Sequence, residues 1–160
     1  MNMSFIIKTY VNSYFQDVYK IVHDTIEKIY PKYYPHEAVS FFHNYHSIEN
    51  MTDDIPKGTT LIALKNNTII GTGSIVSNEI KRMFVLPDQQ SRGYGKLLLQ
   101  ELENIAENNG CNEAQLDVSL GSYGFYKHNG YLMIDYNMIG LLNDCKLCYF
   151  RMKKYLNPGG

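Results

Sequence analysis

The sequence lacks several features that mark special classes of protein. It has no tryptophan, no stretch near the ~18 consecutive apolar residues that a membrane span needs, and no tract rich in proline, glycine or serine. It also lacks an excess of charge of one sign, since 15 Lys and Arg face 16 Asp and Glu. No global field therefore draws the chain to nucleic acid or to an anionic membrane, and we expect neither as a partner. An anionic ligand must be held by a local arrangement of residues.

Cysteine is scarce as well. Cys111, Cys145 and Cys148 are an odd number, and the N-terminus has neither the basic nor the apolar segment of a secretory signal. These features favour reduced thiols and a cytoplasmic location. Cys145 and Cys148 have the spacing of a CxxC motif, but no second pair or nearby histidine completes a metal site.

Three histidines, His36, His43 and His46, lie close together in the sequence. No carboxylate or thiol stands at a suitable spacing to complete a metal site with them. We therefore expect a polar helix face and no metal.

What is present is the composition of an ordinary globular protein. The chain has 160 residues, of which 44% are hydrophobic and 19% are charged. This length and composition predict one domain, residues 1–160, that can bury a core without metal or disulfide support.

Hydrophobic periodicity and turn residues predict a mixture of strands and helices. Ser13 followed by Gln16 has the pattern of a capping box at the start of the first helix. Residues 53–58 contain two Asp, one Pro and one Gly and predict a loop. The predicted strands are residues 5–10, 59–64, 68–77, 79–86, 114–120, 131–139 and 145–155, and the predicted helices are the one after Ser13 and those near 38–45, 93–107 and 122–128. This order predicts an α+β fold in which helices flank both faces of a sheet.

Residues 85–96, VLPDQQSRGYGK, contain a strand end, a turn with two glycines and a helix start. The first amides of a helix are unpaired and lie at the positive end of its dipole, and glycine lets a backbone approach phosphate closely. Arg92 and Lys96 add positive charge at the same place. The segment predicts a phosphate site, with a tight turn that merely requires glycine as the alternative.

Two common phosphate motifs are excluded. A Walker A loop needs four residues between its glycines and Ser or Thr after its lysine, whereas here only Tyr94 separates Gly93 from Gly95 and Leu97 follows Lys96. A dinucleotide fingerprint needs a third glycine where Leu98 stands.

The segment resembles the acetyl-CoA signature of the GNAT acyltransferase superfamily, Q/R-x-x-G-x-G/A, which Gln90, Gly93 and Gly95 fill. A second family element, A/S-x-x-F/Y-Y-x-x-x-G-F/Y, is matched by residues 122–131, SYGFYKHNGY. The resemblance implies a mixed, mostly antiparallel sheet of about seven strands flanked by about four helices. It also implies a splayed cofactor cleft between the strands at 79–86 and 114–120, with acetyl-CoA as cosubstrate.

The same resemblance implies which residues bind the cofactor. Backbone groups of Phe84 and Val85 would hold the pantetheine arm and the thioester carbonyl, and the N–H groups from Ser91 to Lys96 would take the pyrophosphate. Ser119 stands where the family often has an asparagine. The full set of implied cofactor residues is Phe84, Val85, Gln90, Ser91, Arg92, Gly93, Tyr94, Gly95, Lys96, Ser119 and Lys127.

Two residues are the implied catalytic groups. Tyr126 occupies the position of the family tyrosine that gives a proton to the departing thiolate. Because an alkylamine with a pKa near ~10.4 is mostly protonated at neutral pH, the reaction needs a base or a water relay. Glu79 is the candidate base, with a surface carboxylate at a strand end as the alternative, and Asp117 and Asp135 are weaker candidates.

The first two helices and their connection would cover the acceptor. Tyr30, Tyr33 and Tyr34 are the predicted substrate-binding residues, while Phe41 and Phe42 fit helix packing better. The resemblance implies transfer of an acetyl group to a primary amine of a small molecule or peptide. A non-catalytic acyl-CoA sensor is the alternative, and a homodimer that pairs the last strands is compatible with the family.

Overall fold

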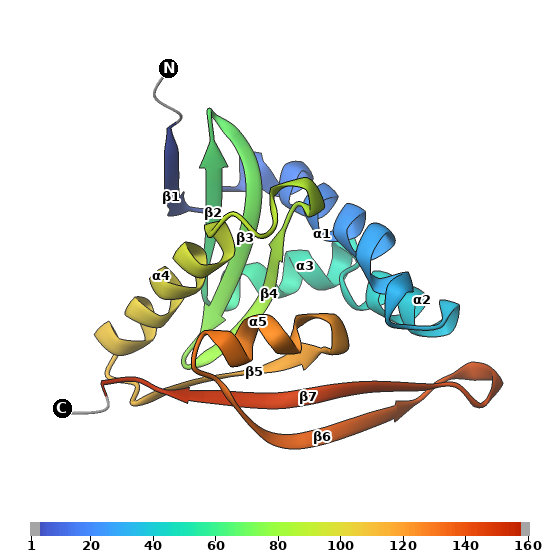
Figure 1. Ribbon diagram of the computed structural model, residues 1–160. Helices are drawn as coiled ribbons and strands as arrows, with labels where there is room; N and C mark the ends of the chain where they lie inside the picture. Colours follow the sequence, from blue (N-terminus) through green and yellow to red (C-terminus); the bar gives the residue numbers. More distant parts are fainter. Residues whose placement is uncertain (1–3, 158–160) are drawn as a thin grey trace.

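The computed structural model describes residues 4–157, which form a mixed sheet with helices on both faces (Figure 1). The strands are β1 (Phe5–Thr9), β2 (Thr59–Lys65), β3 (Thr68–Val76), β4 (Glu79–Val85), β5 (Glu113–Ser119), β6 (Leu132–Gly140) and β7 (Lys146–Tyr155). The α-helices are α1 (Phe15–Ile29), α2 (His36–Tyr45), α3 (Ile48–Asp54), α4 (Tyr94–Asn108) and α5 (Tyr123–His128). The sheet order is β1-β2-β3-β4-β5-β7-β6, and only the β4–β5 pair is parallel. The predicted α+β class and mostly antiparallel seven-stranded sheet are confirmed.

The β2–β3 hairpin forms the centre of one half of the sheet. Its turn residues Asn66 and Asn67 have φ angles of 50° and 65°, the left-handed values that a two-residue hairpin turn requires. Asparagine tolerates this conformation better than most residues, which explains the turn at this position. The hairpin was predicted at this place.

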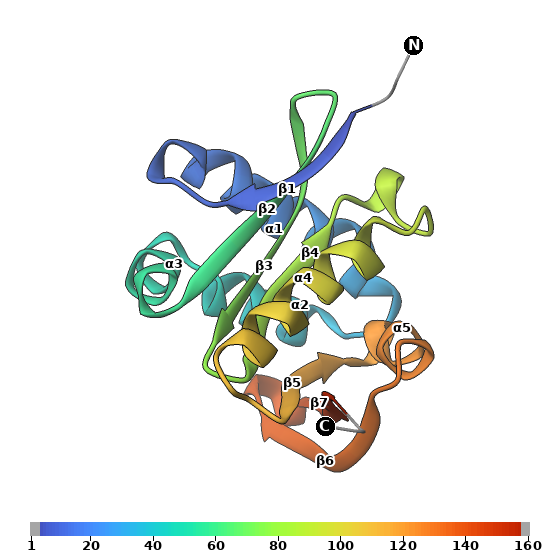
Figure 2. The same cartoon turned by 90° about the vertical axis from the view of Figure 1, so that its left-hand side faces the viewer.

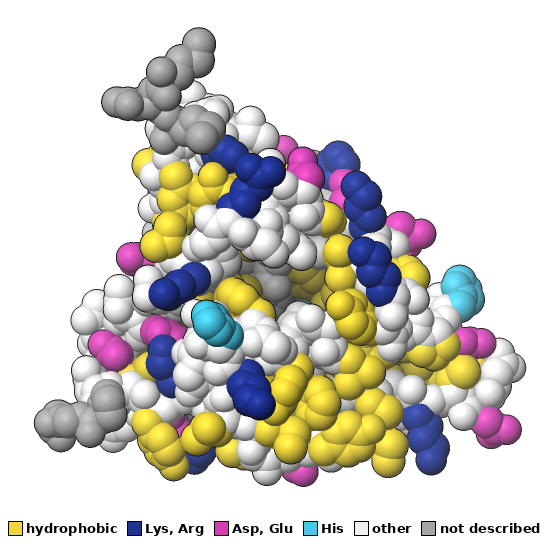
Figure 3. Space-filling model, in the orientation of Figure 1, with side chains coloured by type: hydrophobic (Ala, Val, Ile, Leu, Met, Phe, Trp, Pro, Cys, Tyr) yellow, Lys and Arg dark blue, Asp and Glu magenta, His cyan; other side chains and the backbone are white. Residues whose placement is uncertain are grey.

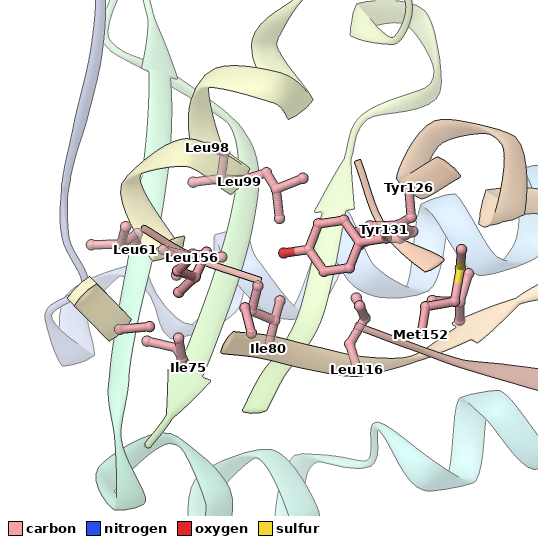
Figure 4. Close-up of a cluster of buried hydrophobic side chains, with 14 residues drawn as sticks. Leu61, Ile75, Ile80, Leu98, Leu99, Leu116, Tyr126, Tyr131, Met152 and Leu156 are labelled. Carbon is pink, nitrogen blue, oxygen red and sulfur yellow. The ribbon is translucent and has the colours of Figure 1, made fainter. Parts of the chain in front are cut away.

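Two hydrophobic clusters lie on opposite faces of the sheet (Figures 1 and 2). One cluster lies under α4 and α5, where Leu98 and Leu99 of α4 face Ile80 of β4 and Leu116 of β5 (Figure 4). The other lies under α1 and α2, and α1 contributes Val18, Ile21, Val22 and Ile26 at helical spacing. Each face of the sheet therefore carries its own core. No helix within residues 4–157 is long and apolar enough to cross a membrane.

Two local predictions differ from the structure, the start of the first helix and the loop at 53–58. Ser13 lies in a 3₁₀ turn, Asn12–Tyr14, and makes no capping hydrogen bond, so the predicted capping box is wrong and α1 begins at Phe15. The predicted loop at 53–58 is also partly wrong, because α3 extends through Asp54. Ser47 caps α3 by accepting a hydrogen bond from the Asn50 amide at 3.2 Å. Five α-helices flank the sheet in the described residues, one more than expected.

The sheet opens between β4 and β5. These two parallel strands share one register pair, Glu79 with Gln115, and then part toward their carboxyl ends. A bulge interrupts β4 beside this gap, because Gly73 of β3 lies opposite both Arg82 and Met83. Arg82 has a φ of 50°, which is rare for a residue other than glycine. The bulge turns the Arg82 side chain toward α2 and α3.

Candidate active site

A cavity of about 240 Å³ lies where β4 and β5 part. Its walls are formed by residues 79–84 of β4, residues 116–119 of β5, Tyr126 of α5, and aromatic side chains of the α1–α2 region. The space-filling view shows the surface hollowed in this region, between α4 and α5 (Figure 3). The two ends of the gap carry different chemistry.

The start of α4 presents backbone amides at the wide end of the gap. Gly93 is the N-cap residue, with a φ of 87°, and no side chain caps the helix or places a carboxylate in its first turn. The amides of Tyr94, Gly95 and Lys96 therefore lack the usual side-chain acceptor, and they lie at the positive end of the dipole of a 15-residue helix. This arrangement fits an anionic group such as a pyrophosphate.

The side chains of the signature loop are arranged around this helix start. Gln90 donates a hydrogen bond from Nε2 to the Val85 carbonyl at 2.9 Å. Tyr94 stacks on Phe5 with ring centroids 4.8 Å apart, and Lys65 Nζ lies 5.3 Å from the centroid of the Tyr94 ring. Ser91, Arg92 and Lys96 are exposed, and within residues 4–157 neither Arg92 nor Lys96 has a carboxylate partner. Both cations remain available to an anion.

The two glycines of the signature are favoured for different reasons. A Cβ on Gly93 would meet no atom within 4 Å, so its left-handed φ alone favours glycine there. A Cβ on Gly95 would come within 3.3 Å of the Phe125 ring, so packing of α4 against α5 favours glycine at that position. The turn alternative therefore explains Gly93 but not Gly95.

The backbone of Val85 faces the gap. The Leu86 amide donates to Ile70 of β3 at 2.8 Å, and neighbouring residues of a strand point their polar groups to opposite edges. The Val85 N–H and C=O therefore point away from β3, while those of Phe84 point toward it. Of the two predicted backbone contacts, the geometry leaves the Val85 N–H free for a ligand, whereas the Val85 carbonyl accepts from Gln90, and Phe84 contributes its buried side chain to the cavity wall.

Tyr126 stands on the cavity wall between β5 and α5. Its side chain is only 5% exposed, and its ring packs edge-on against Tyr131 at 5.5 Å. Thr25 Oγ1 is the one fully occluded side-chain polar atom without a partner in the described residues, so the unpartnered Tyr126 hydroxyl reaches the open space of the cavity. Burial raises the pKa of Tyr126 well above its usual value of 10.0. The phenol therefore keeps its proton and is a hydrogen-bond donor at neutral pH.

Two further predicted cofactor residues differ in position. Ser119 lines the cavity and donates a hydrogen bond from Oγ to the Ser122 hydroxyl at 3.1 Å. Lys127 is exposed in the last turn of α5, 5.9 Å from the Tyr123 ring centroid and away from the cavity wall. Of the two, Ser119 lines the cavity, and a cofactor contact of Lys127 stays a prediction.

Glu79 lines the narrow end of the gap and is paired with Arg151. Both carboxylate oxygens accept hydrogen bonds from the Arg151 guanidinium, which also contacts Asp117 Oδ1 at 3.2 Å. A base role for Glu79 stays a prediction, and it would require this ion pair to loosen. Asp117 lines the same end, whereas Asp135 lies outside the cavity on β6, where its side chain accepts from the Tyr136 amide at 2.8 Å.

The three predicted acceptor tyrosines have three different environments. Tyr30 lines the cavity, and burial raises its pKa to about 12, partly offset by the Ser119 hydroxyl. Tyr34 is buried outside the cavity and accepts from the Leu120 amide at 2.9 Å while donating to the Cys148 carbonyl at 2.7 Å. Tyr33 is half-exposed over Gly121. Phe41 and Phe42, expected to serve packing, line the cavity as well.

A polar network behind the cavity was not predicted. Arg82 donates from Nε to His46 Nδ1 at 3.0 Å and from Nη2 to Asp54 at 3.1 Å. Burial, together with Arg82, lowers the pKa of His46 from 6.5 to about 3. His46 is therefore a buried neutral side chain, and its expected place on a polar helix face is wrong. Its helical spacing from Phe42 could have indicated a buried position, but nothing in the sequence indicates its pairing with Arg82.

A second histidine contact joins α1 to α2. His23 and His43 approach each other through their Nδ1 atoms at 2.7 Å, and His43 Nε2 lies 2.9 Å from Glu27. His23 Nε2 lies 2.7 Å from the His46 carbonyl. Within residues 4–157 no group of three or more His, Cys, Asp or Glu side chains is arranged to hold a metal ion.

Comparisons with known proteins agree with this geometry. The family model described as the acetyltransferase (GNAT) family matches residues 15–131. The chain therefore belongs to the GNAT acetyltransferase family and is an acyltransferase. No curated protein matches the chain.

Solved structures share its fold along nearly the whole length. The GCN5-related N-acetyltransferase of Rhodopseudomonas palustris is 23% identical, with a TM-score of 0.88 over 98% of this chain and 99% of that chain. The PaiA N-acetyltransferase of Thermoplasma acidophilum, solved in complex with coenzyme A, is 24% identical, with a TM-score of 0.78 over 96% of this chain and 100% of that chain. The ribosomal-protein-alanine N-acetyltransferase of Brucella melitensis is 18% identical, with a TM-score of 0.68 over 94% and 99% of the two chains.

Proposed function

We propose that this protein transfers an acetyl group from acetyl-CoA directly to a primary amine of a small molecule or peptide. The observation that carries the proposal is the gap between β4 and β5, with uncapped amides of α4 at its wide end and the Tyr126 hydroxyl on its wall. The diphosphate of the coenzyme fits the amides, and an extended pantetheine arm fits the place where a strand partner of β4 is missing. The coenzyme-bound structure of the Thermoplasma neighbour supports this assignment.

The chain's own groups are placed to assist each part of the transfer. Acetyl-CoA, when bound, supplies the acetyl group as a reactive thioester. The amine nitrogen forms a bond to the acetyl carbon as the bond from that carbon to sulfur breaks, and the nitrogen gives up one proton while the sulfur gains one. We assign to the Val85 N–H, which points away from β3, the charge that develops on the thioester oxygen, and to the Tyr126 hydroxyl a hydrogen bond to the departing sulfur.

The raised pKa of Tyr126 makes it a weaker proton donor to the departing sulfur than the sequence predicts. A phenol near its usual pKa of ~10 would exchange a proton with a thiolate near ~8.5 at little cost. Burial moves the phenol away from that match. Tyr126 therefore acts mainly as a fixed hydrogen-bond donor to the departing sulfur, and the proton that the sulfur gains comes from the amine or from water. The lack of a protein partner leaves the Tyr126 hydroxyl available to a ligand in the cavity, as the proposed role in the transfer requires.

The test is release of coenzyme thiol from acetyl-CoA in the presence of a panel of primary amines. We expect turnover for at least one amine, and a fall in kcat of about 100-fold for Tyr126→Phe, within the range for the loss of one hydrogen-bond donor to a developing negative charge. The dissociation constant for CoA, measured by calorimetry, should stay unchanged.

Tyr123→Phe is the matched control, because Tyr123 lies on the same helix but outside the cavity wall. It should retain the original kcat. Tight coenzyme binding without turnover for any amine would favour the sensor instead.

A further inference from the structure

Each carboxylate on the described cavity wall is engaged by an arginine. Glu79 and Asp117 share Arg151 at the narrow end. On the opposite wall the buried Arg82 is paired with Asp54 at 3.1 Å. Lys81 adds one more exposed cation to the lining. The charges in and behind the lining therefore balance, with Glu79, Asp117 and Asp54 opposed by Arg151, Lys81 and Arg82. A second ammonium group on an acceptor would have to compete with these cations for a carboxylate, so the cavity offers little to a polycation.

The wall formed by α1 and α2 is mainly aromatic. Tyr30, Phe41, Phe42 and Tyr45 line it, and Tyr149 of β7 also lines the cavity. The rings of Tyr30 and Phe42 meet edge to face, with centroids 4.7 Å apart and planes at 88°. Apolar ring edges and faces of this kind favour contact with another ring or a compact alkyl group.

His46 also lies on this wall, and its side chain is polar but carries no charge. Because Arg82 donates to His46 Nδ1, the ring proton of His46 resides on Nε2 and the imidazole is neutral. The Nε2 atom has no partner in the described residues and is not occluded, so it reaches the cavity as a neutral donor. An acceptor therefore meets neutral groups along this wall.

The size of the cavity limits the acceptor. A cavity of about 150 Å³ in another protein accommodates one benzene ring. The present cavity of about 240 Å³ must also admit the end of the thioester arm, so it has room for one ring or a group of similar size. The rest of a peptide acceptor would have to extend through the open side of the cavity.

We propose that the acceptor is a monoamine carried by one compact apolar group, of the arylalkylamine class, with that group seated against Tyr30, Phe42 and Tyr45. This inference rests on the proposed function. An apolar wall without a free carboxylate disfavours the ammonium form of the amine. The bound amine therefore loses its proton more readily, and Glu79 can remain paired with Arg151 during the reaction.

The test compares kcat/KM for 2-phenylethylamine, 1,4-diaminobutane and a short lysine peptide, measured by thiol release from acetyl-CoA. We expect the aryl amine to exceed both others by about tenfold or more, the range that one favourable apolar contact provides. Equal or higher values for the diamine or the peptide would overturn the inference while leaving the proposed function intact. Failure of all amines, or of CoA to bind, would overturn the proposed function and this inference with it.

Two tyrosines provide a matched pair of variants. Tyr45 is 51% exposed and lines the cavity, whereas Tyr136 of β6 is 49% exposed and does not. We expect Tyr45→Ala to raise KM for 2-phenylethylamine about tenfold with little change in kcat, and Tyr136→Ala to change neither. CoA affinity should be the same in both variants. An unchanged KM in Tyr45→Ala, or an equal rise in Tyr136→Ala, would contradict the placement of the apolar group.

Discussion

Arg82 is the side chain that organises the wall opposite β5. Its positive φ places it at the bulge of β4, and only 4% of its side chain is exposed. One nitrogen holds Asp54, and another fixes the proton of His46. A buried arginine would be costly without such partners. The same contacts that satisfy Arg82 keep His46 neutral.

This pairing predicts how stability depends on pH. The pKa of His46 is about 3 in the folded chain, because of burial and Arg82, but near 6.5 when unfolded. The unfolded chain therefore binds a proton between these values, and the free energy of unfolding falls as pH drops below 6.5, by up to about 1.4 kcal/mol per pH unit. Urea unfolding of His46→Gln should show a shallower slope between pH 6 and pH 4. The lowered pKa of His23 also makes the free energy of unfolding fall as pH drops, so part of the pH dependence should remain in His46→Gln.

Gly93 provides a second prediction for a single residue. Its φ of 87° should make Gly93→Ala lose about 1–2 kcal/mol of unfolding free energy, and Gly93→Asn less, because asparagine tolerates the left-handed region. Gly124→Ala is the control. A Cβ on Gly124 also meets no atom within 4 Å, but its φ is not left-handed, so alanine should be neutral or stabilising in α5. Equal losses in thermal or urea unfolding would contradict the backbone explanation.

Among the elements, α4 connects the signature loop to the far end of the sheet. Glu103 on its buried face accepts from the Tyr131 hydroxyl at 3.0 Å and pairs with Lys154 of β7 at 3.1 Å. These contacts hold α4 against the strands on the far side of the gap. The start of α4 is therefore fixed relative to both β4 and β5.

Removal of this buried carboxylate should destabilise the fold. Glu103→Ala leaves the Tyr131 hydroxyl and Lys154 without their partner, and we expect a loss of about 3 kcal/mol in urea unfolding. Glu101→Ala, on the exposed face of the same helix, should stay within about 0.5 kcal/mol of the original protein. Similar effects of the two changes would show that Glu103 contributes only helix propensity.

The elements that the sequence predicts correctly are those with strong local signals. The β2–β3 hairpin has β-branched strands around an Asn-Asn turn, and α4 has a regular apolar face before Gly110. Helix α3 has no such signal, because Met51 is its only buried residue. The capping box at Ser13 failed because a 3₁₀ turn precedes α1, a choice that its own few residues do not determine.

In the candidate site, too, some features can be predicted from the sequence and others cannot. The signature and the Tyr126 element are contiguous motifs, so they are readable from the sequence. The Glu79–Arg151 pair joins residues 72 positions apart, and the Arg82–His46 contact joins residues 36 apart. Such contacts depend on how the strands and helices pack, and a single sequence carries no direct record of them.

For the whole molecule, the main feature is that the sheet consists of two parts. Strands β1 to β4 form one part and β5 to β7 the other, and a single register pair joins them. Helix α4 lies across the junction (Figure 2). Backbone groups that a continuous sheet would pair face the cavity instead.

A ligand that fills this gap should stabilise the whole chain. A coenzyme present at 100 times its dissociation constant is expected to add about 2.7 kcal/mol to the unfolding free energy. We expect CoA to raise the melting temperature in proportion to the logarithm of its concentration. A nucleotide that lacks the pantetheine arm should be tested at the same multiple of its own dissociation constant. It should slow hydrogen exchange of the backbone amides at the start of α4, but not of those on the edge of β4 that contains Val85. Equal protection of that edge by both ligands would contradict the proposed course of the arm.

The nearly divided sheet also bears on how long the protein survives in a cell. Transient separation of two halves that share so few backbone bonds exposes chain segments to proteases, and bound coenzyme opposes that separation. Limited proteolysis of the chain should therefore slow when coenzyme is bound.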